Sequence, residues 1–178
     1  SQRKAFRRIP EERLPLGDYY AKERDTPDAT YSTQAALIKN YAFDRVRFRV
    51  AASTFHTTDL SHWLALDVAT RALEDAGFKG GRQLPRTRTG VLIGNTLTGE
   101  FSRANVLRLR WPYVKKTVCS ALEREGWPED RINRFLQALK GEYMRPFPPV
   151  SEDTLAGGLS NTIAGRICNY FDLHGGGY

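Results

Sequence analysis

Two cysteines and three histidines are the side chains of this sequence best suited to nucleophilic, acid–base or metal chemistry. Cys119 and Cys168 fall within stretches whose apolar residues have helical spacing, whereas an activated thiolate is expected at the N-terminus of a helix. His56, His62 and His174 share no metal-ligand spacing with each other or with a cysteine, and no HExxH motif or paired CxxC is present. We therefore expect packing cysteines, surface or hydrogen-bonded histidines, and no metal site.

Three groups of glycines could approach a phosphate, but their spacing does not match a nucleotide-binding motif. Gly80-Gly81, Gly157-Gly158 and Gly175-Gly176-Gly177 fit neither GxxxxGK[ST] nor GxGxxG. We expect these groups to form turns. The last group also lets the backbone pass very close to another chain before a strand that begins at Tyr178.

A stretch of small polar residues, from Asn95 to Phe101, follows the apolar run Val91-Leu92-Ile93. Because such a run between glycines is typical of a strand covered on both faces, the polar residues would lie at its carboxyl end, where α/β sites form. Two roles stay open for them, namely direct contact with a ligand or a loop whose Asn and Thr cap the next helix. The residue pattern alone slightly favours the cap.

The elements that position these residues are mainly helices. One helix follows the caps Thr57-Thr58-Asp59 and ends at Gly77, where a left-handed turn is easily adopted. Another starts near Phe101 and either kinks at Pro112 or gives way there to a new helix, which ends at Gly126.

Two further helices are predicted towards the end of the sequence. One starts at Pro128 and has an apolar stripe as far as Tyr143, with acidic residues against the positive end of its dipole. The other runs from Ser160 to Phe171 and stops at His174 and Gly175. Its Ala164 and Gly165 leave room for close backbone contact, so we expect this helix to be buried.

Strands are less clearly indicated than helices. The approximate alternation of apolar residues from Phe43 to Val50 is consistent with a short strand or an extended segment. The prolines within residues 1–40 predict an extended surface segment there, which leaves residues 41–178 to form the folded part. Helices that alternate with a few buried strands give an α/β class.

Length and composition favour a soluble globular protein. The sequence has 178 residues, of which 40% are hydrophobic, enough for one domain or a large part of one. No apolar run approaches the roughly 20 residues that span a bilayer, and the N-terminus has no apolar stretch typical of a signal peptide. Two cysteines without a recognisable pairing motif predict a reduced, cytoplasmic location. The lack of a long apolar run predicts no membrane contact.

The net charge of +7 raises nucleic acid as a possible partner. The basic residues form two modest clusters, Arg3, Lys4, Arg7 and Arg8 in one and Arg103, Arg108, Arg110, Lys115 and Lys116 in the other. Neither cluster is interleaved with exposed aromatic residues, as a platform for single-stranded nucleic acid requires. A solvated basic face is therefore the favoured interpretation, and nucleic acid is disfavoured.

The sequence also resembles a known family. Residues 160–178, SNTIAGRICNYFDLHGGGY, resemble the segment immediately before the active-site cysteine in ketosynthase (β-ketoacyl synthase) domains of polyketide synthases. Residues 94–114, GNTLTGEFSRANVLRLRWPYV, narrow the resemblance to the iterative synthases that make enediyne polyene precursors. STFHTTDLSHW stands where the family usually has a Pro-Gln-Gln-Arg-type motif, a departure associated with the enediyne group.

The resemblance covers nearly the whole chain and implies the N-terminal half of a thiolase-like fold. The chain is then expected to be an interior fragment without the family's first strand, its first helix and everything from the nucleophilic cysteine onward. The complete domain would catalyse decarboxylative Claisen condensation of acyl and malonyl thioesters. Residues 1–178 would contain no catalytic residue and would be inactive alone.

The resemblance also implies two sets of site residues. Four residues would flank the acyl pocket: Thr96, Thr98, Phe101 and Asn161. Four others would lie near the two-fold axis of a homodimer: Gly175, Gly176, Gly177 and Tyr178.

The partners implied are an acyl carrier protein domain and other polyketide synthase domains. No cofactor would be bound directly, because phosphopantetheine on the carrier protein presents the substrates. Acidic carrier proteins would be steered towards a basic surface. A non-catalytic basic scaffold that binds an acidic protein or nucleic acid remains the alternative. A cysteine among small residues that opens a helix after Tyr178 would favour the synthase.

Overall fold

The computed structural model describes residues 5–96 and 99–178, which divide into two compact units at residue 42. In the first unit, β1 (Phe6–Arg8) pairs antiparallel with β2 (Gln34–Ala36), so that Phe6 lies opposite Ala36. The short helix α1 (Leu16–Tyr19) lies between them in the sequence and starts after Pro15. The segment expected to be extended therefore contains short pieces of regular structure.

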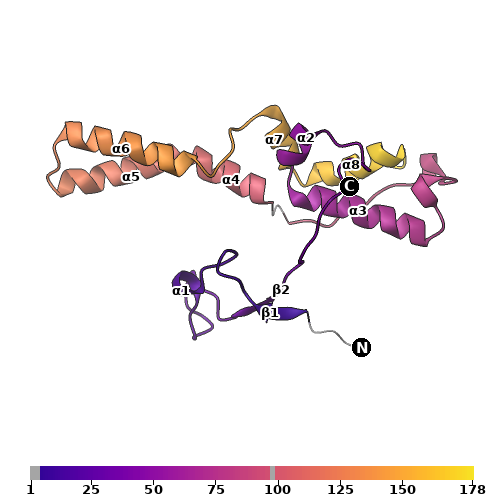
Figure 1. Ribbon diagram of the computed structural model, residues 1–178, viewed down its shortest axis with the longest axis horizontal. Helices are drawn as coiled ribbons and strands as arrows, with labels where there is room; N and C mark the ends of the chain where they lie inside the picture. Colours follow the sequence, from indigo (N-terminus) through magenta and orange to yellow (C-terminus); the bar gives the residue numbers. More distant parts are fainter. Residues whose placement is uncertain (1–4, 97–98) are drawn as a thin grey trace. The chain divides into compact units, whose positions relative to one another are not determined.

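Residues 43–178 form the second unit, and helices dominate it (Figure 1). In chain order these helices are α2 (Ala52–His56), α3 (Leu60–Asp75), α4 (Glu100–Leu109), α5 (Trp111–Arg124), α6 (Glu129–Met144), α7 (Glu152–Gly157) and α8 (Asn161–Phe171). Two 3₁₀ turns, η1 (Lys79–Gly81) and η2 (Arg86–Arg88), connect α3 to the segment before α4.

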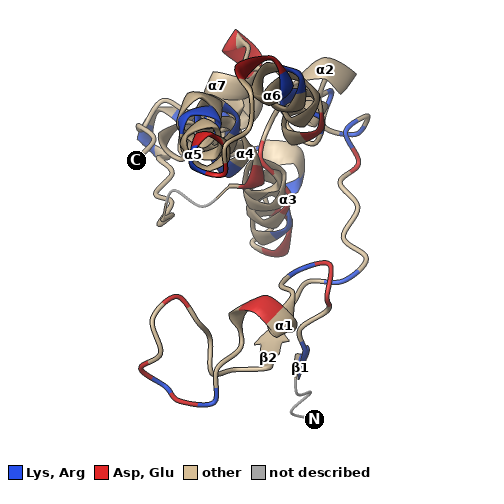
Figure 2. Ribbon diagram, turned by 90° about the vertical axis from the view of Figure 1, so that its left-hand side faces the viewer, with Lys and Arg blue, Asp and Glu red and all other residues tan. Residues whose placement is uncertain are grey.

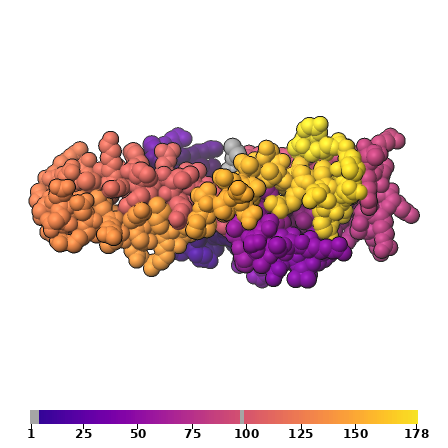
Figure 3. Space-filling model, turned by 90° about the horizontal axis from the view of Figure 1, so that it is seen from above, coloured from indigo at the N-terminus to yellow at the C-terminus, as the bar shows by residue number. Residues whose placement is uncertain are grey.

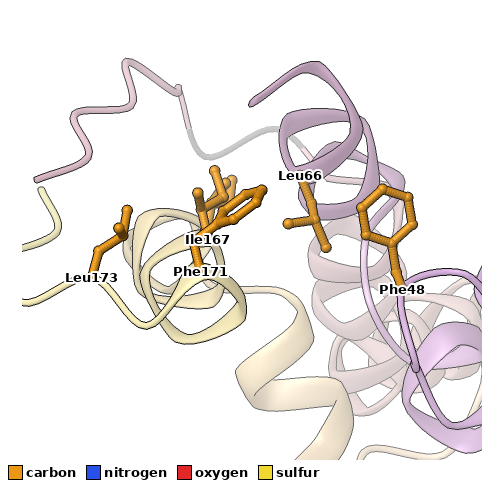
Figure 4. Packing of buried hydrophobic residues seen from close by; sticks show 6 residues of the cluster. Phe48, Leu66, Ile167, Phe171 and Leu173 are labelled. Carbon is orange, nitrogen blue, oxygen red and sulfur yellow. The ribbon is translucent and has the colours of Figure 1, made fainter. Parts of the chain in front are cut away.

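The hydrophobic core of this unit lies where α3 packs on α8. The buried side chains are Phe48, Leu66, Ile163, Ile167, Phe171 and Leu173, most of which are labelled in Figure 4. Leu66 comes from α3 and Ile167 from α8, and each is at most 2% exposed. Because full burial of such a side chain contributes about 1.5–3 kcal/mol, this contact fixes the two helices against each other.

The helices α5 and α6 form an antiparallel pair with its own apolar contacts (Figure 1). Trp111 on α5 and Ile132 and Leu136 on α6 are buried. Arg110 separates α4 from α5, and Pro112 lies in the first turn of α5. Of the two possibilities left open at Pro112, the structure therefore shows a new helix rather than a kink.

Two of the glycines predicted to end helices do so, whereas the left-handed residue after α8 is not the predicted glycine. Gly77 and Gly126 have φ values of 91° and 75°, as expected for the left-handed turns after α3 and α5. The helix α8 ends at Phe171, as predicted, but the left-handed conformation after it is adopted by Asp172, with φ 55°, rather than by Gly175. A short polar side chain tolerates this conformation better than most others do.

The predicted strands are mostly not formed. Residues 45–49 are turns, not the strand expected from the apolar alternation, although Phe48 is buried as that pattern suggested. In the described part of residues 43–178, β pairing is limited to a parallel bridge between Val91 and Gly177. Leu92 is 81% exposed, so the run 91–93 is not covered on both faces.

The described helices include none that is both long enough and apolar enough to cross a membrane.

Candidate functional site

The N-terminus of α4 is held by a side chain from another part of the chain. The carboxylate of Asp59 is buried and accepts a hydrogen bond from the backbone N–H of Phe101, at 2.6 Å. The backbone N–H of Asp59 in turn donates to the carbonyl of Gly157 on α7, at 2.9 Å. Asp59 therefore joins the start of α3 to both α4 and α7.

The structure differs from the sequence-based predictions about which residues cap α3 and α4. Asp59 immediately precedes α3, but its side chain makes no capping hydrogen bond with that helix. The residue at the N-cap position of α4 is Gly99, not Asn95 or Thr96, and the hydroxyl of Ser102 pairs with its backbone. A Cβ on residue 99 would collide with the Asp59 carboxylate, which explains why glycine fits there.

The predicted acyl-pocket residues occupy different settings. Thr96 is exposed in the loop before α4, and Thr98 lies outside the described residues. Phe101 is partly buried in the first turn of α4, and Asn161 is the exposed first residue of α8. Within the described ranges no hydrogen bond joins Thr96 or Asn161 to Phe101, so their shared role as pocket wall stays a prediction.

A buried polar group close to Asp59 in the sequence was not anticipated. His62 is 1% exposed, and its Nδ1 has no hydrogen-bond partner among the described residues. Burial, and secondarily the positive charge of Arg166, lower the pKa of His62 to about 4. The four-residue spacing of His62, Leu66 and Thr70, all buried on α3, is the sequence signal that could have indicated this.

Both cysteines lie within helices, as their apolar neighbours at helical spacing predicted. Cys119 lies in the middle of α5, where its Sγ is 3.4 Å from Oε1 of Glu123, a contact that raises the pKa of the thiol. Cys168 is partly buried in α8, with its Sγ 3.6 Å from the carbonyl oxygen of Gly176. Neither lies at a helix N-terminus, where the dipole would favour a thiolate.

The histidines and acidic residues do not gather into a metal site. The described residues contain no group of three or more His, Cys, Asp or Glu side chains that could hold a metal ion. His174 is exposed and faces Asp172 at 3.2 Å, while His56 contacts the edge of the Phe55 ring.

The glycine run before Tyr178 packs against residues 86–93 of the same chain. The N–H of Gly175 donates to the carbonyl of Thr89, the N–H of Val91 to Gly176, and the N–H of Tyr178 to Val91. A Cβ on Gly175 would come within 2.7 Å of the Gly90 nitrogen. The expected close passage of the backbone thus occurs within the chain, whereas the dimer interface predicted at residues 175–178 stays a prediction.

The predicted basic cluster before α5 is only partly a surface feature. Arg108 donates to the carbonyl of Phe147 at 2.7 Å, so its guanidinium ties α4 to the segment after α6. Figure 2 shows acidic residues alongside the basic ones on α5 and α6. Of the other predicted cluster, Arg3 and Lys4 lie outside the described residues.

The comparison with family models identifies the class of protein. The model for the N-terminal domain of β-ketoacyl synthases matches residues 1–178. The chain therefore belongs to the β-ketoacyl synthase family, whose fold is thiolase-like, although the described residues are mainly helical. This confirms the resemblance at the level of the ketosynthase domain.

A relative among the curated proteins is a polyunsaturated fatty acid synthase chain from Thraustochytrium sp. (strain ATCC 26185 / S-3). It is 27% identical over 167 residues, which cover 94% of this chain. The chain spans 6% of the length of that relative. This chain therefore aligns with a short part of a much longer synthase.

Proposed function

We propose that this chain is part of a ketosynthase domain that joins an acyl thioester to a malonyl thioester by decarboxylative Claisen condensation. The observation that carries the proposal is the match of the whole chain, residues 1–178, to the β-ketoacyl synthase family. The similarity to a polyunsaturated fatty acid synthase supports the same reaction class.

The chain's own residues contribute the support of the site rather than its nucleophile. Condensation needs a thiolate stabilised near a helix N-terminus and donors for the thioester oxyanion. Cys119 and Cys168 do not have that setting, and the contact with Glu123 raises the pKa of Cys119. The packing of α3 on α8 instead supplies a rigid base, and Asp59 fixes where α4 begins.

At a finer level, we propose an iterative synthase of the enediyne type. The support is the sequence of residues 94–114 and the segment STFHTTDLSHW, which resemble that group. Thr96, Thr98, Phe101 and Asn161 would line part of the acyl pocket. Of these residues, Phe101 has its backbone held in place by the hydrogen bond to Asp59.

The partners proposed are an acyl carrier protein, other synthase domains and a second copy of the domain. The carrier protein would present substrates on phosphopantetheine, so no directly bound cofactor is needed. The net charge of +7 would favour an acidic carrier. Gly175, Gly176, Gly177 and Tyr178 would lie near the two-fold axis, and sedimentation at micromolar concentration should then show a dimer of the complete domain.

Acylation mapping tests the proposed function. A synthase that contains residues 1–178 is incubated with an acyl thioester, digested, and searched by mass spectrometry for the acylated cysteine. We expect the acyl group on a cysteine other than Cys119 and Cys168, and an unchanged yield in a Cys119→Ser/Cys168→Ser variant. Acylation at either of these two cysteines would contradict the assignment of the nucleophile. No acylation at all, together with binding of an acidic protein, would favour the non-catalytic scaffold.

A further inference from the structure

A cavity of about 320 Å³ lies between α8 and the segment around residues 48–54. In Figure 3 this purple segment lies directly against the yellow helix α8, and the ring of Phe48 is 5.3 Å from that of Tyr170. The cavity is apart from the predicted acyl-pocket residues, since none of those that the structure describes lines it. Its volume is at the lower end of the range typical of small-molecule sites.

Arg166 is the central polar group of this cavity. Its guanidinium carbon lies 4.8 Å from the centre of the Trp63 ring, and the other contacts of that ring include Phe43, at 5.2 Å. Stacking on an aromatic ring holds a guanidinium in a fixed orientation and leaves the N–H groups at its edge available. Arg166 is therefore positioned before any ligand arrives.

The charge of Arg166 has no direct counter-ion. No ion pair joins Arg166 to a carboxylate in the described part of the chain, and its Nε is buried without a hydrogen-bond partner. Burial lowers the pKa of Arg166, and the more distant Asp153 offsets this in part. Arg166 is half-buried, so part of its charge is withdrawn from water without a counter-ion, and an anion bound beside it would be favoured.

A second arginine lines the same cavity in a strained conformation. Arg49 has a φ of 56°, which glycine adopts readily and a long side chain does not. Arg49 is exposed, and no ion pair or hydrogen bond of its side chain is present in the described residues, so its guanidinium is available to a ligand at the mouth of the cavity.

The rest of the lining matches an anion attached to an apolar group. The lining residues include no acidic side chain, while Thr54 and Asn169 add polar groups and Phe48, Leu66 and Tyr170 add apolar surface. His62, which senses the charge of Arg166, is neutral above its pKa of about 4 and so adds no further charge near neutral pH.

We propose that this cavity binds a small organic anion, a carboxylate or phosphate on a short apolar group, with Arg166 and Arg49 holding the anionic end. Two parallel N–H donors of Arg166 suit either oxyanion. The aromatic wall contacts the apolar part. The proposal does not depend on the condensation function.

Isothermal titration calorimetry with two probes tests the proposal. Phenylphosphonate and benzoate carry a phosphorus oxyanion and a carboxylate directly on the same ring, so the difference in their affinities shows which anion the cavity prefers. We expect saturable binding with one site per chain. Arg166→Gln should weaken it about 10- to 100-fold, because charged hydrogen bonds are lost.

Arg49→Gly keeps the test valid if Arg166→Gln fails to fold. Glycine relieves the positive φ while removing the guanidinium, so the variant should keep or raise the melting temperature and still weaken binding about 3- to 10-fold. Arg103→Gln on α4 is the matched control, because Arg103 is an exposed arginine outside the cavity. This variant should bind both probes with unchanged affinity.

Three results would overturn the proposal. One is the absence of saturable binding for both probes. Another is an unchanged affinity in the folded Arg49→Gly variant. The third is an equal loss of affinity in Arg103→Gln, which would show that only the overall positive charge matters.

Discussion

Asp59 has a role that depends on a residue 42 positions away in the sequence. Its carboxylate accepts the Phe101 N–H and lies at the positive end of the α4 dipole, so one side chain both satisfies a free donor and adds a favourable charge interaction. Because Asp59 is 2% exposed, solvent does not replace this interaction when the carboxylate is removed.

Asp59→Ala should therefore lower the free energy of unfolding by about 1–2 kcal/mol, the usual effect of losing a helix cap. Urea denaturation measures this. Asp75→Ala, at the exposed end of α3, is the control and should change the stability by less than about 0.5 kcal/mol. Equal effects of the two substitutions would contradict the capping role.

His62 makes stability depend on pH. The unfolded chain binds a proton at this residue with a pKa near 6.5, whereas the folded protein does so only near about 4. The stabilisation is complete above pH 6.5 and is lost as the pH falls towards 4, because the unfolded state then binds more protons.

The free energy of unfolding should fall by up to about 3 kcal/mol between pH 6.5 and pH 4 on account of His62. His62→Gln should reduce this slope, as measured by urea denaturation at several pH values. His56→Gln changes an exposed histidine and should leave the slope intact. A slope that survives in His62→Gln would assign the pH dependence to other groups.

At the scale of elements, Gly165 in α8 and Gly157 at the end of α7 differ in the space available for a side chain. The sequence suggested that Gly165 leaves room for a neighbouring helix, but the structure shows open space around it, and the buried residue is Ala164. The residue Gly157 at the end of α7 is the crowded one, because a Cβ there would come within 2.6 Å of the Thr58 Cα. No neighbouring helix packs on the Cβ side of Gly165, although a Cβ on Gly177 would come within 3.3 Å of the backbone of both Ala164 and Gly165, so the expected close contact occurs elsewhere on that turn.

Gly165→Ala should raise the free energy of unfolding by up to about 1 kcal/mol, because alanine is the better helix former and meets no obstacle. Gly157→Ala should lower it by about 1–3 kcal/mol through overpacking. Thermal melts of the two variants compare these effects directly. A lower melting temperature for Gly165→Ala would show that this helix face is covered.

At the scale of the whole molecule, residues 86–93 and 174–178 are joined by a series of backbone hydrogen bonds. The hydrogen bonds of Gly175, Val91 and Tyr178 require the two segments to approach closely. Glycine at residues 90 and 175 permits this approach, because a Cβ on either would meet the opposite backbone.

Gly175→Ala should separate the two segments. Hydrogen exchange at the Val91, Gly175 and Tyr178 amides should become faster, since their hydrogen bonds would be lost. Gly94→Ala is the matched control, because nothing lies within 4 Å of a Cβ at that position. Unchanged exchange in Gly175→Ala would mean that the pairing tolerates a side chain there.

The sequence by itself determined most of the helices. The apolar spacing of about 3.6 residues marked α3, α5, α6 and α8, and Gly77 and Gly126 marked two of their ends, because these signals act within one or two turns of chain. The motif of residues 160–178 also pointed to the β-ketoacyl synthase family, which the family match confirms.

Only the tertiary structure decided which partner each polar side chain meets. Asp59 could have capped α3, the helix that follows it, but instead caps α4; Arg166 could have faced solvent, but stacks on Trp63. The strand predicted at residues 91–93 also depends on partners, because a strand covered on both faces needs a paired neighbour along its length and a layer on each face, and here only Val91 bridges to Gly177 while Leu92 is exposed. Local spacing fixes the face on which a residue lies, whereas distant segments of the chain decide what covers that face.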